Sequence, residues 1–384
     1  MDVAELIRSA RELPRTHRET LWPLQFKRRP EDFQVDEVLG FELSGSGEHL
    51  WVQVCKTGIN TAEVVRRLAA AANIAPRQIG FAGLKDKHGV CRQWLSLHMP
   101  GQYGHELAAA LLPGHVSPDG ALRIEHSAWN HRKLKRGSHR ANRFCIRLYA
   151  AQPFSTTERA AIQQRLSLIA SEGVPNYFGE QRFGFDNLGK AARLFAGESL
   201  RLTRNERSLV LSAARSALFN AVLARRVREG NWNCYLNGDV LNLAGTGSVF
   251  VAEADDPDIV RRVTEQDVHP TGPLWGRGEN RAVRRAGALE QDVLSAWQLF
   301  REGLERAGLE QQRRSLRLPV QALHYRFFQD GADSQDQAAS NTSAESGLEL
   351  TFTLPTGSYA TAVLHELIRQ ESAALQQDKN NDRP

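Results

Sequence analysis

Cysteine is scarce in this sequence, and long hydrophobic runs are absent. The chain of 384 residues has four cysteines, Cys55, Cys91, Cys145 and Cys234, which lie far apart without the spacing of a metal site. This pattern argues for a reducing compartment and against both disulfides and zinc binding. No apolar run approaches the ~20 residues that a membrane-spanning helix needs. We therefore expect no membrane association.

Motifs for cofactors and metals are also missing. The sequence has no Gly-x-Gly-x-x-Gly fingerprint. Residues 184–191 differ from a phosphate-binding P-loop by one residue, but Ala191 removes the hydroxyl that would bind magnesium, and no apolar strand precedes the segment. Residues 365–369 resemble a zinc-protease helix until Arg369 stands in place of the second histidine. We expect neither a cofactor nor a metal.

The composition is that of an ordinary globular protein, with 41% hydrophobic and 24% charged residues. At this length two domains are a better expectation than one. The first residues of the chain carry acid where a signal peptide carries base, so the expected location is the cytoplasm.

Positive charge is concentrated in one segment. The formal net charge is only +5, but residues 131–143 contain six Lys or Arg and no acid. Such a run releases counterions when it contacts a phosphate backbone, and it can bind nucleic acid without reading sequence. A solvated basic face is the alternative. The nucleic-acid interpretation is favoured because the run directly precedes a predicted strand that carries Asn142 and Phe144.

A carboxylate between lysines and glycines is the candidate for chemistry. The apolar run 79–82 predicts the end of a strand, and the glycines that follow let the backbone turn tightly and approach a ligand. Asp86 would then lie at the tip of a loop, ionised at neutral pH, with Lys85 and Lys87 favouring the charged form. Such a group suits a nucleophile or a base toward an anionic substrate. A charged turn between two strands is the alternative.

Hydrophobic periodicity predicts elements on both sides of this loop. Strands are expected at 33–38, 49–56, 90–99, 122–125, 144–149, 239–243, 248–252 and 348–354. Helices are expected at 60–72, 102–112, 158–172, 205–229, 257–266, 290–314 and 358–368. The polar segment 329–347 is expected to be a loop, and the tail after residue 376 to be disordered.

Several motifs together resemble one family. The segment Gly80-Phe81-Ala82-Gly83-Leu84-Lys85-Asp86-Lys87-His88, followed by Gln93-Trp94, resembles the signature of the TruD family of tRNA pseudouridine synthases. Four further motifs follow that family's order: Pro30-Glu31-Asp32-Phe33, Asn142-Arg143-Phe144, residues 174–184 (VPNYFGEQRFG) and residues 354–361 (LPTGSYAT). The resemblance therefore spans almost the whole chain.

The resemblance implies a site. It makes Asp86 the catalytic residue and gives Lys27 as a charge partner for that carboxylate. Four side chains would surround the target uridine: Phe33, Asn142, Phe144 and Tyr359. Arg182 and the basic run would hold phosphates. The family usually has Phe where this chain has Tyr359, whose ring keeps the capacity to stack and gains a hydroxyl.

The resemblance also implies a fold and a reaction. The fold would be α+β, with the mixed, largely antiparallel catalytic sheet of pseudouridine synthases flanked by helices, and with a smaller inserted α-rich α+β domain. Residues 1–172 and 318–384 would form the catalytic domain, and residues 173–317 the insertion. The enzyme would convert uridine-13 of tRNA to pseudouridine as a monomer, without a cofactor or protein partner. A catalytically silent structural RNA-binding protein is the alternative, and a glycosidic hydrolase is disfavoured because only one carboxylate is found near position 86.

Overall fold

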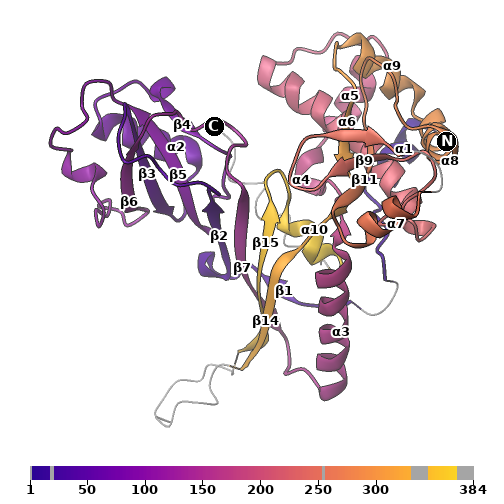
Figure 1. Ribbon diagram of the computed structural model, residues 1–384, viewed down its shortest axis with the longest axis horizontal. Coiled ribbons are helices and arrows are strands. Elements are labelled where there is room, and N and C mark those ends of the chain that lie inside the picture. Colours follow the sequence, from indigo (N-terminus) through magenta and orange to yellow (C-terminus); the bar gives the residue numbers. More distant parts are fainter. Residues whose placement is uncertain (1, 18–20, 253–255, 330–344, 370–384) are drawn as a thin grey trace. The chain divides into compact units, whose positions relative to one another are not determined.

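The computed structural model describes residues 2–17, 21–252, 256–329 and 345–369, which form two compact units. The described residues of Trp22–Leu166, Val320–Gly357 and Arg369–Pro384 form one, here called the sheet unit. Those of Met1–Leu21, Ser167–Pro319 and Ser358–Ile368 form the other, the helical unit. The ribbon is shown in Figure 1. The division into a catalytic domain (1–172 and 318–384) and an inserted domain (173–317) stays a prediction.

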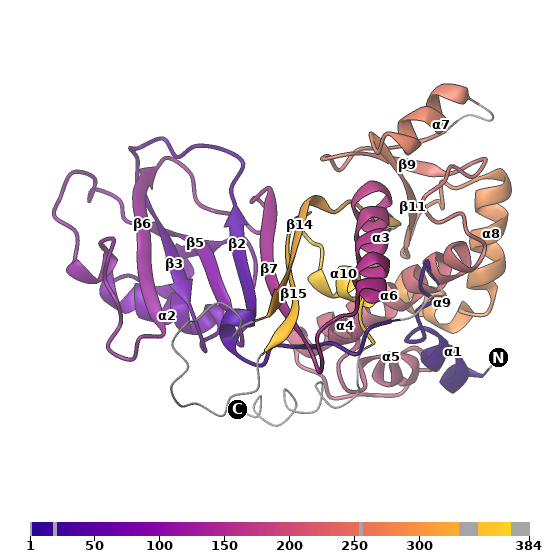
Figure 2. The ribbon, with the colours of Figure 1, turned by 90° about the horizontal axis from the view of Figure 1, so that it is seen from below.

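The sheet unit is built on a nine-stranded sheet with the strand order β14-β15-β7-β2-β5-β3-β6 (Figure 2). Along this path β2 and β5 run parallel to each other, and every other neighbouring pair is antiparallel. Two short strands lie off the path, with β1 on β7 and β4 on β5. The strands are β1 (Gln25–Phe26), β2 (Phe33–Val38), β3 (His49–Lys56), β4 (Ile79–Phe81), β5 (Val90–His98), β6 (Leu122–Asn130), β7 (Ala141–Ala150), β14 (Gln321–Gln329) and β15 (Ser346–Pro355). The expected mixed, largely antiparallel sheet is confirmed.

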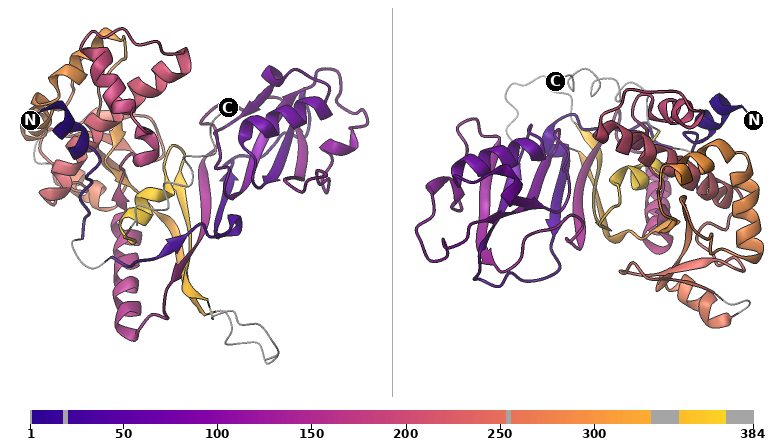
Figure 3. Two further views of the ribbon diagram at one scale, coloured as in Figure 1. Left: turned by 180° about the vertical axis from the view of Figure 1, so that it is seen from behind. Right: turned by 90° about the horizontal axis from the view of Figure 1, so that it is seen from above.

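Helix α2 (Thr61–Ala71) covers one face of this sheet (Figure 3). Asn60 caps it as expected, since its side chain accepts a hydrogen bond from the backbone N–H of Glu63 at 2.8 Å. Val64 and Leu68 are buried in one core cluster with apolar residues of β3 and β5. The apolar residues that alternate along the strands therefore pack against the apolar side of the helix, which repeats every 3.6 residues.

The helical unit confirms the expected smaller α-rich α+β architecture. Its strands form a four-stranded sheet in the order β10-β9-β11-β12 and a two-stranded pair, β13 with β8. The strands are β8 (Val174–Pro175), β9 (Val240–Leu243), β10 (Val249–Val251), β11 (Val268–Leu274), β12 (Gln312–Ser315) and β13 (Arg317–Leu318). The helices are α1 (Val3–Ser9), α4 (Glu180–Phe183), α5 (Asn187–Phe195), α6 (Arg204–Arg228), α7 (Pro257–Thr264), α8 (Arg284–Ser295), α9 (Gln298–Arg306) and α10 (Ala360–His365). Helix α3 (Thr156–Glu172) begins in the sheet unit and ends in this one.

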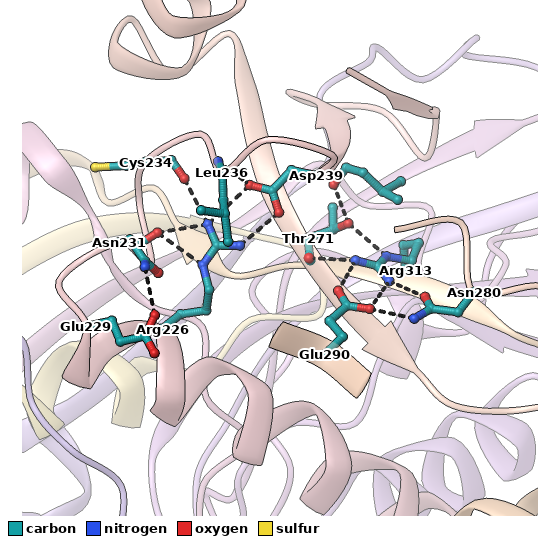
Figure 4. A network of polar contacts seen from close by, with 11 residues as sticks. Arg226, Glu229, Asn231, Cys234, Leu236, Asp239, Thr271, Asn280, Glu290 and Arg313 are labelled. Atoms are coloured by element: carbon teal, nitrogen blue, oxygen red, sulfur yellow. Dashed lines mark hydrogen bonds and ion pairs between the residues drawn. The ribbon is translucent and has the colours of Figure 1, made fainter. Parts of the chain in front are cut away.

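Two buried ion pairs tie the helical unit together (Figure 4). Arg226 of α6 meets Asp239, just before β9, at 2.8 Å. Arg313 of β12 meets Glu290 of α8 at 2.6 Å. Both arginines also donate to backbone carbonyl groups, so the charges are paired and further protons are used. Buried charges of this kind hold elements in register because removal of one partner leaves the other charge uncompensated.

Two helix predictions were wrong. In segment 102–112 only the 3-10 helix Ala109–Leu111 forms, and Gly104 has a φ of 84°, which an α-helix cannot contain. The single helix expected at 290–314 is instead α8 and α9, followed by a turn through Gly308 at φ 80° and by strand β12. Strand β14 reaches Gln329 and strand β15 begins at Ser346, so the expected loop is shorter, and its residues 330–344 and the tail lie outside the described residues.

The structure also explains the two segments that resemble a P-loop and a zinc-protease helix. Residues 187–191 of the P-loop-like segment begin α5, whose Leu188 and Ala191 are fully buried. His365 is a half-buried histidine in α10, with Nε2 3.1 Å from the carbonyl oxygen of Leu13. Burial lowers the pKa of His365 to about 4. No helix in the described part of the chain is long and apolar enough to cross a membrane.

We expect Leu68→Ala to weaken the sheet unit by about 2–5 kcal/mol, because it opens a cavity between α2 and the sheet. Hydrogen exchange of the β3 amides measures this opening in the sheet unit alone. The control is Arg66→Ala in the same helix, where the side chain is 74% exposed, with an expected change within about 0.5 kcal/mol. Equal exchange rates in both variants would contradict the assigned core.

Candidate active site

The loop that carries Asp86 joins β4 to β5 and is held at several backbone groups. The carbonyl of Gly83 accepts a hydrogen bond from the Gln93 side chain at 2.5 Å, and the N–H of Lys85 donates to the Thr61 hydroxyl at 3.1 Å. The carbonyl of Lys87 accepts from the N–H of Gly58 at 3.1 Å. These bonds come from β5 and from both ends of the turn before α2. The position of Asp86 is therefore fixed by ordered elements.

The Asp86 carboxylate has two partners. Lys27 Nζ lies 2.5 Å from Oδ2, and the backbone N–H of His88 donates to Oδ1 at 2.9 Å. The side chains of Lys27 and Asp86 are only 21% and 25% exposed. Burial acts to raise the pKa of Asp86, but Lys27 and the His88 N–H together outweigh it and hold that pKa below its usual value. The carboxylate is therefore ionised at neutral pH and screened little by solvent.

The source of this charge stabilisation differs from the expectation. Lys85 and Lys87, its sequence neighbours, were expected to favour the ionised form of Asp86. Instead the Lys85 ammonium binds elsewhere, 2.8 Å from Glu37 Oε1 and 2.8 Å from the amide oxygen of Asn142. The cation at Asp86 comes from Lys27, 59 residues earlier in the chain. Lys27 has a φ of 59°, a strained conformation for a residue with a Cβ.

Sequence reasoning missed a buried lysine beneath the loop. Lys56, at the end of β3, is fully buried and donates to the carbonyl oxygen of Asp86 at 2.5 Å and to that of Ile59 at 2.9 Å. Burial lowers the pKa of Lys56. The sequence did contain a signal for this burial, because Lys56 is an even number of residues from the core residues Leu50 and Val54 and so lies on the same face of the strand.

The two phenylalanines expected in a substrate pocket lie together. The rings of Phe33 and Phe144 are 6.1 Å apart with an angle of 58° between their planes, and Lys27 Nζ lies 4.6 Å from the centre of the Phe33 ring. Phe352 of β15, which was not anticipated, stacks on Phe144 at 5.5 Å and 27°. Phe33 and Phe144 are buried, so a purely structural ring pair remains the alternative to a stacking surface.

Asn142 lies opposite Glu37 where β7 pairs with β2, and opposite Leu354 where β7 pairs with β15. Phe144 follows two residues later on the same face of the strand. The Lys85 side chain joins the Asn142 amide to the buried Glu37 carboxylate. The sheet unit thus brings Lys27 into contact with Asp86 and Phe33, and Phe33 into contact with Phe144. Asn142 contacts Lys85, the residue before Asp86.

The basic run forms the connection between β6 and β7 and packs beside the Asp86 loop. The N–H of Gly137 donates to the carbonyl of Ala82 at 2.8 Å, and the Arg136 guanidinium lies 4.9 Å from the centre of the Phe81 ring. A Cβ on Gly80 would lie 2.3 Å from the carbonyl oxygen of Leu134, so only glycine permits this approach. All six Lys and Arg residues of the run are exposed: Arg132, Lys133, Lys135, Arg136, Arg140 and Arg143.

Arg182 and Tyr359, the other two expected site residues, belong to the helical unit. Arg182 donates to the Tyr359 hydroxyl at 3.1 Å and to the Ser212 hydroxyl at 3.1 Å. Its guanidinium also lies 5.2 Å from the centre of the Phe178 ring. The hydroxyl that distinguishes Tyr359 from phenylalanine therefore has a partner, and the two residues form one polar cluster within their own unit.

We expect Lys27→Met to raise the pKa of Asp86, because burial would then be opposed chiefly by the His88 N–H. Carbon-13 NMR of the Asp86 carboxyl group measures this pKa directly. The ion pair also makes the stability of the fold depend on pH. It stabilises the fold above the usual pKa of aspartate, and this contribution is lost as the pH falls through the lowered pKa of Asp86.

The matched control is Lys87→Met, which removes the adjacent charge in the sequence and leaves Lys27 in place. Its effect on the Asp86 titration should be much smaller than that of Lys27→Met. An unchanged titration in Lys27→Met, or an equal shift in both variants, would contradict the assigned partner.

Comparisons with known proteins give a consistent result. The family model for tRNA pseudouridine synthase D (TruD) matches residues 23–191 and 185–367. The tRNA pseudouridine synthase D of Methylococcus capsulatus is 43% identical over 359 residues, which is 93% of this chain and 94% of that protein. The proteins of the same name from Xanthomonas euvesicatoria and Nitrosococcus oceani are 43% and 44% identical. These two matches cover 92% and 91% of this chain, and 94% and 91% of the relatives.

A solved structure from Methanosarcina mazei, described as a putative tRNA pseudouridine synthase D, superposes with a TM-score of 0.71. The match covers 97% of this chain and 99% of that one at 19% identity, and it shows a shared fold. The family model and the relatives each span most of the chain. By these matches the chain belongs to the TruD family of tRNA pseudouridine synthases.

Proposed function

We infer that this protein is an isomerase that converts a uridine of tRNA to pseudouridine, and we propose from the family resemblance that the target is uridine-13. The observation that carries the inference is the ionised Asp86 carboxylate, held by Lys27 beside the Phe33 ring and next to an exposed basic loop. Membership of the TruD family supports the reaction and the class of substrate.

The reaction is an isomerisation, so it needs no added atoms or electrons. The protein must supply a carboxylate and a closed environment. The bond from uracil N1 to ribose C1′ breaks, the base rotates, and C5 joins C1′, while the C5 hydrogen leaves as a proton and N1 gains one. Asp86 would act by attacking C1′, by adding to the base, or by removing a ribose proton. Each of these first steps needs the ionised form, which Lys27 and the His88 N–H stabilise.

The substrate must present an everted nucleotide, because stacking in the RNA hides the reacting atoms. Eversion costs about a few kcal/mol, which contacts with the extruded base and with phosphates offset. We propose that Phe33, Phe144 and Tyr359 contact the base, that Asn142 hydrogen-bonds it, and that Arg182 and the basic loop bind phosphates. The exposed cations of that loop lie next to the Asp86 loop, where the phosphates flanking the target would pass.

We further propose that the protein works in the cytoplasm as a monomer. The four cysteines are free, as suits a reducing compartment where tRNA is also found.

Release of tritium from C5-labelled uridine in tRNA tests the reaction and the role of Asp86. We expect turnover without free uracil for the wild type, and at least about 1,000-fold slower turnover for Asp86→Asn, because a neutral amide can serve in none of the three first steps. Free uracil would indicate a hydrolase instead. Silence from both proteins, with tRNA binding retained, would indicate a structural RNA-binding protein.

A second test separates a stacking Phe144 from a core Phe144. We expect Phe144→Ala to slow catalysis far more than it weakens tRNA binding, because stacking of one base, worth about 1–3 kcal/mol, is a small part of a phosphate-driven affinity. Phe144→Leu keeps apolar volume but lacks the ring, so it should also slow catalysis. Near-normal turnover in Phe144→Leu, or equal losses of rate and affinity, would assign Phe144 to the core alone.

A further inference from the structure

A buried polar chain ends at the Asn142 amide. The N–H of Trp94 in β5 donates to Glu37 Oε2 at 2.9 Å, Glu37 Oε1 lies 2.8 Å from Lys85 Nζ, and Lys85 Nζ lies 2.8 Å from Asn142 Oδ1. The side chains of Lys85 and Glu37 are 7% and 0% exposed. Two opposite charges with so little solvent around them hold their geometry firmly.

This series of polar contacts determines which end of the Asn142 amide is free. An ammonium group has only donors, so it must face the amide oxygen, and a rotated amide would place two donors against each other. The other end, Nδ2, is then directed away from Lys85. Besides Lys85, the side chain that interacts with the Asn142 amide among the described residues is the His139 ring. Because Nδ2 carries two protons, at least one remains for a ligand.

A neighbouring histidine does not change this result. The pKa of His139 is lowered, mainly because the ring is buried, and Lys85 acts in the same direction. The ring is therefore neutral at pH 7 and brings no second charge to the amide. An amide nitrogen carries two protons, so a hydrogen bond from Asn142 to the His139 ring would still leave one proton for a substrate.

We propose that Lys85 is a positioning residue that fixes Asn142 as a hydrogen-bond donor, so that Asn142 Nδ2 binds a carbonyl oxygen of the target uracil rather than its N3–H. The proposal rests on the proposed function, and it adds the polarity of the contact and the residue that sets it. Glu37 in turn fixes Lys85. Lys85, which is adjacent to Asp86 in the sequence, thus orients the base through Asn142, while Lys27 maintains the charge of Asp86.

Asn142→Asp tests the polarity of the contact. A carboxylate keeps the size of the side chain and still accepts from Lys85, but it offers no donor. We expect kcat to fall about 10- to 100-fold, as in Asn142→Ala, with the KM for tRNA changed less than about threefold, because a buried hydrogen bond is lost and phosphate contacts remain. If Asn142→Asp keeps more than about half of the wild-type kcat, the donor assignment is wrong.

The role of Lys85 is tested in the double variant Glu37→Gln with Lys85→Met. It removes both buried charges together, and the new glutamine keeps an acceptor for the Trp94 N–H. We expect kcat to fall about tenfold when Asn142 is present, and less than about twofold further when the background is Asn142→Ala, since no amide is then left to orient. The same factor in both backgrounds would mean that Lys85 only supports the loop.

The outcomes distinguish a failure of the proposed function from a failure of the inference about Asn142. A wild-type protein that forms no pseudouridine would overturn the proposed function itself. An active wild type with Asn142→Asp at normal kcat would overturn only this inference. If the double variant does not fold by circular dichroism, the Asn142→Asp comparison with Asn142→Ala still decides the donor assignment, because both keep Glu37 and Lys85.

Discussion

One short contact, between Lys27 and Asp86, sets the charge of a largely buried carboxyl group in the sheet unit. Asp86 is largely covered by protein, and burial by itself would drive its carboxyl group toward the neutral form. The Lys27 ammonium at 2.5 Å reverses that tendency. Most of the surrounding structure serves to hold this pair in place: the Lys56 ammonium binds the Asp86 carbonyl oxygen, and Gln93 binds the carbonyl three residues earlier. A carboxylate that is both ionised and poorly hydrated is more reactive than one in water.

The fold and the family were accessible from sequence because their signals are local. Alternation located β3, β7 and β15, the Asn60 cap located α2, and the motif around Asp86 identified the family. The failures have local causes as well. Apolar residues at 102–112 have helical spacing, but Gly104, at a left-handed φ, lies among them, and one long helical pattern concealed the break between α8 and α9.

The polar contacts of the site were harder to predict. Parity along the strands places Glu37 and Lys56 on buried faces, which indicates that each must have a partner, yet parity does not name the partner. Lys85 was assigned to Asp86 because the two are adjacent in sequence, whereas adjacent side chains in an extended loop point to opposite sides. Lys27 was identified only by resemblance, since its contact depends on a strained backbone. The pairing of Arg182 with Tyr359 joins two segments 177 residues apart, and periodicity has no access to such pairs.

The interleaving of the chain has a consequence for its synthesis. Strand β7 pairs with β15 along its whole length, and the helical unit includes residues from both Met1–Leu21 and Ser358–Ile368. A ribosome that adds about 5–20 residues per second needs on the order of 10–40 s to pass from β7 to β15. During that interval the nascent chain presents β7 as an unpaired edge, open to other nascent strands. Neither unit can be completed until residues 346–368 have left the exit tunnel, so this edge of β7 stays without its native partner until then.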